Sequence, residues 1–456
     1  MAASVGAQSL ERITPGQEWP DRKGEHINAH GGGLLFHEGK YYWYGENRPA
    51  RGFTTEVGVE VYSSSDLMNW EDEGVALAVS EEAGHDIERG CIMERPKVVR
   101  NPKTGKFVML FHLELKGKGY APAEQNKERW HFSGPFDIET GKLLYAGGEE
   151  GYEEITCKYL LDKMKKDPSV VAITSGTPGV MGFTKSKREE AGKQFVDVGI
   201  AEETAVALAS GIAANGGKPF YGVYSTFVQR AFDQISQDLC INNNPATIVT
   251  FLGSVYGMND VTHLGLQDIP MLGNIPNLVY LAPVTKEDYL AMLDWSMGQR
   301  EHPVAIKLPG GKLISDGKAV TKDFGQLNKY EVTQEGSKVA VIGLGAFYGL
   351  GQAAADLLEK KTGIQATVIN PYYITGVDTG LLEGLKKNHS VVVTLEDGIL
   401  DGGFGEKIAR FYGDSDVKVL NFGLKKEFLD RYDVDAVLKE NHLTAEQIVE
   451  DVLSIL

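Results

Sequence analysis

The stretch FVDVGIAEETAVALASGIAANGGKPFYGVYSTFVQRAFDQISQDLC, residues 195–240, decides the fold class of the larger part of this chain. Its segment AEETAVALASGIAANG is rich in alanine and closes with glycine, which predicts a helix with a C-terminal cap. The apolar run SVVAITSG (169–176), upstream of it, predicts a buried strand. A strand followed by a helix is the first step of an α/β alternation.

The alternation continues on both sides of this stretch. Upstream, GYEEITCKYLLDKMKKD (151–167) has helical periodicity. Downstream, ATIVTFLG (246–253) and NLVYLAP (277–283) predict strands, and TKEDYLAMLDWSMGQ (285–299) predicts a helix. This order is typical of a parallel sheet with crossover helices.

A second α/β unit is predicted further on. It begins at SKVAVIGLG (337–345) and ends with TAEQIVEDVLSIL (444–456), and residues 310–330 form the expected linker before it. The fold class is therefore α/β, with two parallel or mixed-sheet domains.

The N-terminal part of the chain has a different hydrophobic pattern. Residues 25–114 read as short strands in about three hairpins: GGLLFHEGKYYWYGE (32–46), VGVEVYSSSDLMNWEDEG (57–74) and ERPKVVRNPKTGKFVMLFH (94–112). Because no helical pattern interrupts them, we predict an incomplete all-β segment.

Composition limits the function classes. The 456 residues suggest two to four domains, and the net charge of −17 argues against a binder of nucleic acid or anionic membranes. The three cysteines form no CxxC pair, so neither a zinc site nor a disulfide framework is expected. No signal peptide is evident, and no apolar run approaches the ~18 residues of a membrane span. A cytoplasmic enzyme acting on small molecules is expected.

Residues 195–240 resemble the pyrimidine-binding domain of thiamine-diphosphate enzymes, most closely the 1-deoxy-D-xylulose-5-phosphate synthase family. GYAPAEQNKERWHFSGPFDIETG (119–141) is similar to that family's link from its diphosphate-binding domain, and residues 341–409 are similar to its C-terminal domain. The resemblance, over about 116–456, implies a linker at 116–149, a pyrimidine-binding domain at 150–315 and a C-terminal domain at 330–456.

The resemblance also implies roles for two cofactor-binding residues. In the motif DVGIAE it assigns to Glu202 the carboxylic acid that protonates the cofactor's aminopyrimidine and so helps to activate thiamine diphosphate. Such a group needs a pocket of low dielectric, which favours the protonated form. In YSTFVQRAFDQ it places Phe227 where the family stacks an aromatic ring on the aminopyrimidine. The neighbour Glu203 is expected to have no role.

Five further residues are substrate-side candidates by the same resemblance. Tyr224 and Arg230 are expected to line the substrate side, with the arginine able to hold a phosphate or carboxylate. His131, in RWHFSGPFD, and His263, in GMNDVTHLG, are expected to transfer protons or bind hydroxyl groups. Asn259 stands where the family has aspartate.

The chain departs from the family at the acceptor phosphate. FLGSVYG (251–257) replaces a segment with one arginine, and Gly310 in KLPGG replaces a second. Because two charge-assisted phosphate partners are lost, we expect a different aldehyde or sugar-phosphate acceptor.

The sequence lacks the motif that binds the diphosphate half of the cofactor. The family's Gly-Asp-Gly and a following Asn hold Mg²⁺ on the diphosphate, and no Gly-Asp-Gly occurs here. We therefore expect Mg²⁺ to come from a domain outside this chain, and activity to need a partner subunit that carries it. Family members are dimers, so a homodimer is also expected.

In place of that domain, residues 25–115 resemble the start of a glycoside hydrolase family 43 β-propeller. Glu94 matches an active-site carboxylate of those enzymes, but the later blades are missing, so we interpret it as a remnant. The same applies to Glu46, His30 and Trp43. The string KGKGY (116–120) suits both families, and we interpret the chain as a chimera joined there.

Three interpretations stay open. The first is a partial synthase-like transferase that moves a two-carbon unit from pyruvate to a sugar-phosphate aldehyde and is inactive alone. The second is a galactanase fragment of family 43. The third is a non-catalytic chain folded only from about residue 150.

Overall fold

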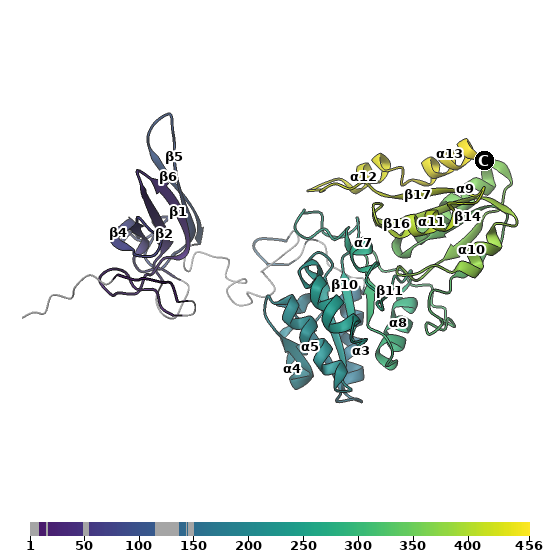
Figure 1. The fold of residues 1–456 in the computed structure, drawn as a ribbon, viewed down its shortest axis with the longest axis horizontal. Helices are drawn as coiled ribbons and strands as arrows, with labels where there is room; N and C mark the ends of the chain where they lie inside the picture. Colours follow the sequence, from purple (N-terminus) through teal and green to yellow (C-terminus); the bar gives the residue numbers. More distant parts are fainter. Residues whose placement is uncertain (1–8, 15–16, 49–53, 115–135, 143, 145–149) are drawn as a thin grey trace, which may run out of the picture. The chain divides into compact units, whose positions relative to one another are not determined.

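The computed structural model describes residues 9–14, 17–48, 54–114, 136–142, 144 and 150–456. The chain divides into two compact units, 1–146 and 147–456 (Figure 1). Within the described ranges, no helix is long and apolar enough to cross a membrane.

The first unit is built from antiparallel strands. A four-stranded sheet has the order β1-β2-β3-β4, and β5 pairs with β6 in a separate hairpin. The strands are β1 (His30–His37), β2 (Lys40–Glu46), β3 (Gly58–Ser64), β4 (Glu71–Ala78), β5 (Ile92–Arg100) and β6 (Phe107–Glu114). A tryptophan cluster fills the core of the sheet, where Trp19, Trp43 and Trp70 have ring centroids 5.3–6.4 Å apart. The predicted all-β segment is confirmed.

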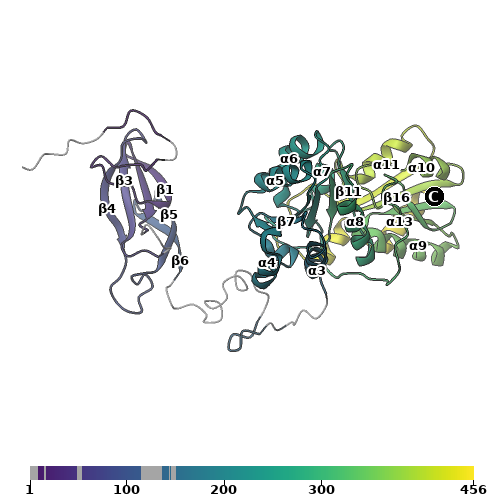
Figure 2. The same ribbon diagram turned by 90° about the horizontal axis from the view of Figure 1, so that it is seen from below.

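The second unit begins with a six-stranded sheet of order β11-β12-β10-β9-β7-β8, in which every pairing is parallel. Its strands are β7 (Val170–Thr174), β8 (Phe195–Asp197), β9 (Lys218–Tyr224), β10 (Thr247–Phe251), β11 (Val279–Leu281) and β12 (Val304–Lys307). Its helices are α3 (Tyr152–Met164), α4 (Lys185–Ala191), α5 (Glu202–Ala214), α6 (Phe232–Gln234), α7 (Asp268–Leu272) and α8 (Lys286–Gly298). Short helical turns are η1 (Pro178–Met181), η2 (Gly192–Gln194), η3 (Phe227–Ala231) and η4 (Ile235–Cys240). Helix α5 packs into one apolar core, and α3 and α8 pack into another. Figure 2 shows where these three helices lie in the ribbon.

A five-stranded sheet follows, with the order β13-β15-β14-β16-β17. Its pairings are parallel except for the edge strand β13, which makes the sheet mixed. The strands are β13 (Glu331–Gln334), β14 (Lys338–Gly343), β15 (Thr367–Asn370), β16 (His389–Ile399) and β17 (Lys418–Leu424). The helices are η5 (Gly345–Phe347), α9 (Tyr348–Thr362), α10 (Thr379–Leu385), α11 (Phe404–Tyr412), α12 (Val434–Glu440) and α13 (Ala445–Ile455). The predicted α/β class with two sheets is confirmed.

The two sheets of the second unit share one apolar core and a polar seam. Lys307 at the end of β12 donates to both carboxylate oxygens of Asp268 at 2.8 Å, and both side chains are buried. Ser254 Oγ donates to Asp397 Oδ2 at 2.5 Å, which joins the loop after β10 to β16. This ion pair and this charge-assisted hydrogen bond hold the strand ends beside which the candidate site lies.

Candidate functional site

Glu202 lies at the start of α5, directly after a tight turn. Asp197 Oδ1 accepts the backbone N–H groups of Gly176 and Gly199 at 2.9 Å, and Gly199 has a φ of +71°, which glycine adopts without strain. The turn delivers the Glu202 side chain into the protein, where the residue is 1% exposed. Its Oε2 accepts a hydrogen bond from Arg230 Nη1 at 3.1 Å. A buried carboxylate with one cationic partner is a strong candidate for proton chemistry.

Three rings form a cluster on and around the short helix that carries Arg230, the partner of Glu202. Phe227 opens η3, the same short helix that carries Arg230. Its ring lies 5.4 Å from that of Tyr224, at the end of β9, and 5.2 Å from that of His263. The Tyr224 and His263 rings are 6.0 Å apart. Arg230 therefore contacts Glu202, and the short helix η3 joins this pair to the ring cluster of Tyr224, Phe227 and His263.

His263 is held by its own loop. Its Nδ1 lies 3.0 Å from Asp260 Oδ1 and 2.8 Å from Thr262 Oγ1, and Thr262 Oγ1 also donates to Asp260. The hydrogen bonds from Thr262, and then that from His263, hold the pKa of Asp260 below its usual range. Because Nδ1 is engaged, the ring offers Nε2 to a substrate.

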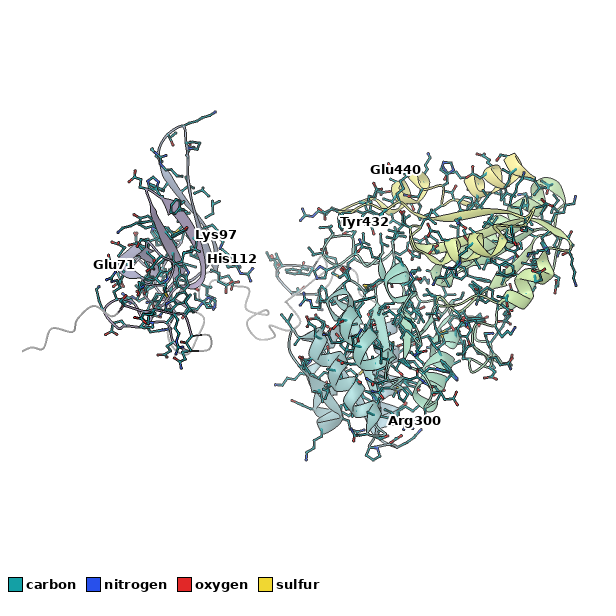
Figure 3. The ribbon with its side chains drawn as sticks, viewed as in Figure 1. Glu71, Lys97, His112, Arg300, Tyr432 and Glu440 are labelled. Atoms are coloured by element: carbon teal, nitrogen blue, oxygen red, sulfur yellow. The ribbon has the colours of Figure 1, made fainter. Side chains whose placement is uncertain are left out.

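The loop that carries His263 is clamped by residues near the C-terminus. Tyr432 (labelled in Figure 3) donates from its hydroxyl to the carbonyl of Val255 at 2.7 Å. The Arg431 N–H donates to the carbonyl of Asn259 at 2.6 Å. Asn259 is exposed, and its described contact is through this backbone carbonyl, so its predicted role in substrate binding stays a prediction. His131 lies outside the described residues.

Sequence reasoning missed the two residues that support this site. Asp197 fixes the turn before Glu202, and Asp260 fixes His263. The first was detectable, since an aspartate two residues before a glycine is a common turn signal. The second depends on a loop geometry that no local pattern predicts.

The first unit holds a separate charged cluster. Arg48 donates to Glu46 Oε2 and to Glu94 Oε1, each at 2.6 Å, and lies 3.5 Å from His30 Nε2. The hydrogen bond from Arg48 holds the pKa of Glu94 below its usual range. Trp43 packs in the tryptophan core rather than in this cluster.

Among the described residues, no group of three or more His, Cys, Asp or Glu side chains is arranged to hold a metal ion.

Two family models match the second unit. Residues 153–314 match the family "Transketolase, pyrimidine binding domain", and residues 328–448 match "Transketolase, C-terminal domain". The 1-deoxy-D-xylulose-5-phosphate synthase of Clostridium beijerinckii is 34% identical over 378 residues, which cover 82% of this chain. That of Caldanaerobacter subterraneus subsp. tengcongensis is 34% identical over 377 residues, or 81% of this chain. The matches span 59% and 58% of those relatives' own length.

Solved structures give the same fold. A split-gene transketolase, described as an inactive β4 tetramer, has a TM-score of 0.57 at 22% identity and covers 66% of this chain and 97% of its own. The transketolase of Pichia stipitis in complex with sedoheptulose 7-phosphate has a TM-score of 0.55 at 16% identity, over 68% of this chain and 46% of its own. A stretch of 24% of this chain is 71% identical to 32% of a family 43 β-1,3-galactosidase, with a TM-score of 0.23. With both transketolase domains present in order and synthases at 34% identity, the chain belongs to the transketolase and 1-deoxy-D-xylulose-5-phosphate synthase family.

Proposed function

We propose that this chain supplies the aminopyrimidine-binding half of a thiamine-diphosphate site, for transfer of a two-carbon unit from pyruvate to an aldehyde. The observation that carries the proposal is the buried Glu202 carboxylate at the start of α5, with the half-buried Phe227 ring nearby. Thiamine diphosphate, when bound, supplies the carbon nucleophile of such a transfer.

The residues fit the aminopyrimidine part of the cofactor. Glu202 is shielded from water, so a hydrogen bond from its carboxyl group to a ring nitrogen escapes competition from solvent. Phe227 is half-buried and would supply a ring for stacking, and the Tyr224 ring lies 5.4 Å from it at an interplanar angle of 77°. His263, presenting Nε2, is placed to hold or move a proton on the substrate.

The described residues do not fit the metal and diphosphate part, since they contain no candidate metal cluster. We infer that Mg²⁺ and the diphosphate are held by a second polypeptide carrying that domain, or by residues outside the described ranges. The relatives' extra length supports this, because the match spans 59% of the Clostridium beijerinckii synthase. The match to 97% of a split-gene transketolase chain gives a precedent for division at this point in the fold.

Calorimetric titration of the whole chain with thiamine diphosphate and Mg²⁺ tests the half-site. We expect weak binding that Glu202→Ala reduces at least tenfold, about 1.4 kcal/mol. The matched control is Glu203→Ala, which removes the same charge one residue further along α5. Equal titrations for the wild type and Glu202→Ala would contradict the proposal.

A glycosidase role for the first unit has less support. A general acid of that chemistry needs a raised pKa, whereas Arg48 holds the pKa of Glu94 low. We therefore keep the interpretation of that unit as a remnant.

The proposed join at residues 116–120 is tested by sequencing a transcript across it: two separate parent genes without a spanning transcript would indicate an artefact of assembly.

A further inference from the structure

A cleft with a volume of about 360 Å³ opens beside Tyr224 in the second unit. Its walls come from the segment before and at the start of α3, from the end of β10, and from the turn after β12. The volume lies within the range of small-molecule sites, roughly 300–1,000 Å³. Tyr224 also borders the ring cluster of Phe227 and His263, so the cleft adjoins the candidate site.

Carboxylates dominate the charge of this cleft. Glu150 is already paired with Lys286 of α8. Glu153 is exposed, and within the described ranges its carboxylate has no ion pair or side-chain hydrogen bond. Glu153 and Tyr224 both line the cleft, and burial and then the Glu153 charge raise the pKa of Tyr224. The Tyr224 hydroxyl has no hydrogen-bond partner within the same ranges, so both groups are available to a ligand.

Gly310, in the turn after β12, also lines the cleft and leaves no room for a cationic side chain at its own position. A Cβ built on Gly310 would lie 2.3 Å from Gly257 Cα, so no side chain fits there. Leu252, also in the wall, is apolar. Lys312 is the one cation lining the cleft within the described ranges, and it is exposed and already has a partner. A phosphate group here would face Glu153 with little compensation, whereas a hydroxyl can donate to Glu153 and accept from Tyr224.

We propose that this cleft binds the hydroxylated end of an uncharged short-chain hydroxyaldehyde, with Glu153 selecting against phosphate esters. The inference rests on the proposed function, because it makes the cleft the acceptor side of the same site.

The test compares D-erythrose with D-erythrose 4-phosphate on the purified whole chain by ligand-observed NMR titration. We expect the free sugar to bind at least tenfold more tightly than its phosphate ester. Glu153→Lys should shift this ratio at least tenfold toward the ester. Glu359→Lys, the same charge change at an exposed position on α9, should leave it unchanged.

Equal or tighter binding of the ester, a ratio unmoved by Glu153→Lys, or no binding of either sugar would overturn the inference. The two titrations distinguish failure of this inference from failure of the proposed function. A chain that binds thiamine diphosphate through Glu202 but binds no sugar loses only this inference. A chain that binds erythrose but shows no Glu202-dependent cofactor binding loses the proposed function.

Discussion

Replacement of Lys307 by methionine should destabilise the second unit strongly. The ammonium group donates to both oxygens of Asp268 at 2.8 Å, and the two side chains are 6% and 0% exposed. Methionine keeps the aliphatic stem and removes the charge. It therefore leaves a carboxylate buried in the seam between the two sheets.

The magnitude follows from what remains around Asp268. Removing one partner of a buried ion pair costs about 3–5 kcal/mol. The Tyr280 hydroxyl at 2.8 Å and the Ile269 N–H at 2.9 Å still donate to the carboxylate, so we expect the lower end, about 3 kcal/mol. Replacing both charges, Lys307→Met with Asp268→Leu, should restore stability to within about 1 kcal/mol, the worth of the hydrogen bond that Tyr280 then loses.

Urea unfolding followed by helix ellipticity measures this change. Among the described residues, helices occur only in the second unit, so the signal reports on that unit. Lys158→Met, on the exposed face of α3, is the control and should change the free energy of unfolding by less than about 0.5 kcal/mol. A loss below about 1 kcal/mol for Lys307→Met, or a double variant no more stable than the single one, would refute the reasoning.

Three further variants have defined outcomes. Burial raises the pKa of Glu396 to about 7, so between about pH 4.5 and 7 the folded state keeps a proton that the unfolded chain has released, and the free energy of unfolding should fall as pH rises. Glu396→Gln should remove up to about 3 kcal/mol of that fall. An unchanged slope of stability against pH in urea titrations of this variant would contradict the prediction. Gly310→Ala places a Cβ 2.3 Å from Gly257 Cα and should cost at least about 2 kcal/mol, whereas an unchanged urea midpoint would show that the contact relaxes freely. Arg230→Met breaks the ion pair with Glu202, and because the arginine side chain is 50% exposed and screened by water, the free energy of unfolding should fall by only about 1 kcal/mol. A loss above about 3 kcal/mol in the same urea assay would mean that water does not screen this pair.

Much of the fold was predictable because its signals are local. The alanine-rich run with a closing glycine predicted α5, and the structure has a helix there at Glu202–Ala214. The alternation of apolar runs with helical periods predicted two α/β sheets. The antiparallel edge strand β13 was not foreseen, because the four residues Glu331–Gln334 carry too short a pattern to specify their pairing.

The candidate site was predictable in its residues more than in its contacts. Resemblance singled out Glu202, Phe227 and His263, and their assigned roles stay predictions. The pairing of Arg230 with Glu202 joins residues 28 positions apart, and no pattern in the sequence couples them. The division into a linker at 116–149 and domains at 150–315 and 330–456 also stays a prediction.

The clamp on the His263 loop limits how a gene of this kind can be divided. Tyr432 and Arg431, near the end of the chain, hold the carbonyls of Val255 and Asn259. Asp430 accepts the Val261 N–H at 3.2 Å. A cut between the two sheets would leave the loop that carries His263 without these three contacts, whereas a cut ahead of α3 keeps all of them in one polypeptide. The second α/β domain is therefore needed to hold a loop of the first, and separating the two would expose that loop to local unfolding.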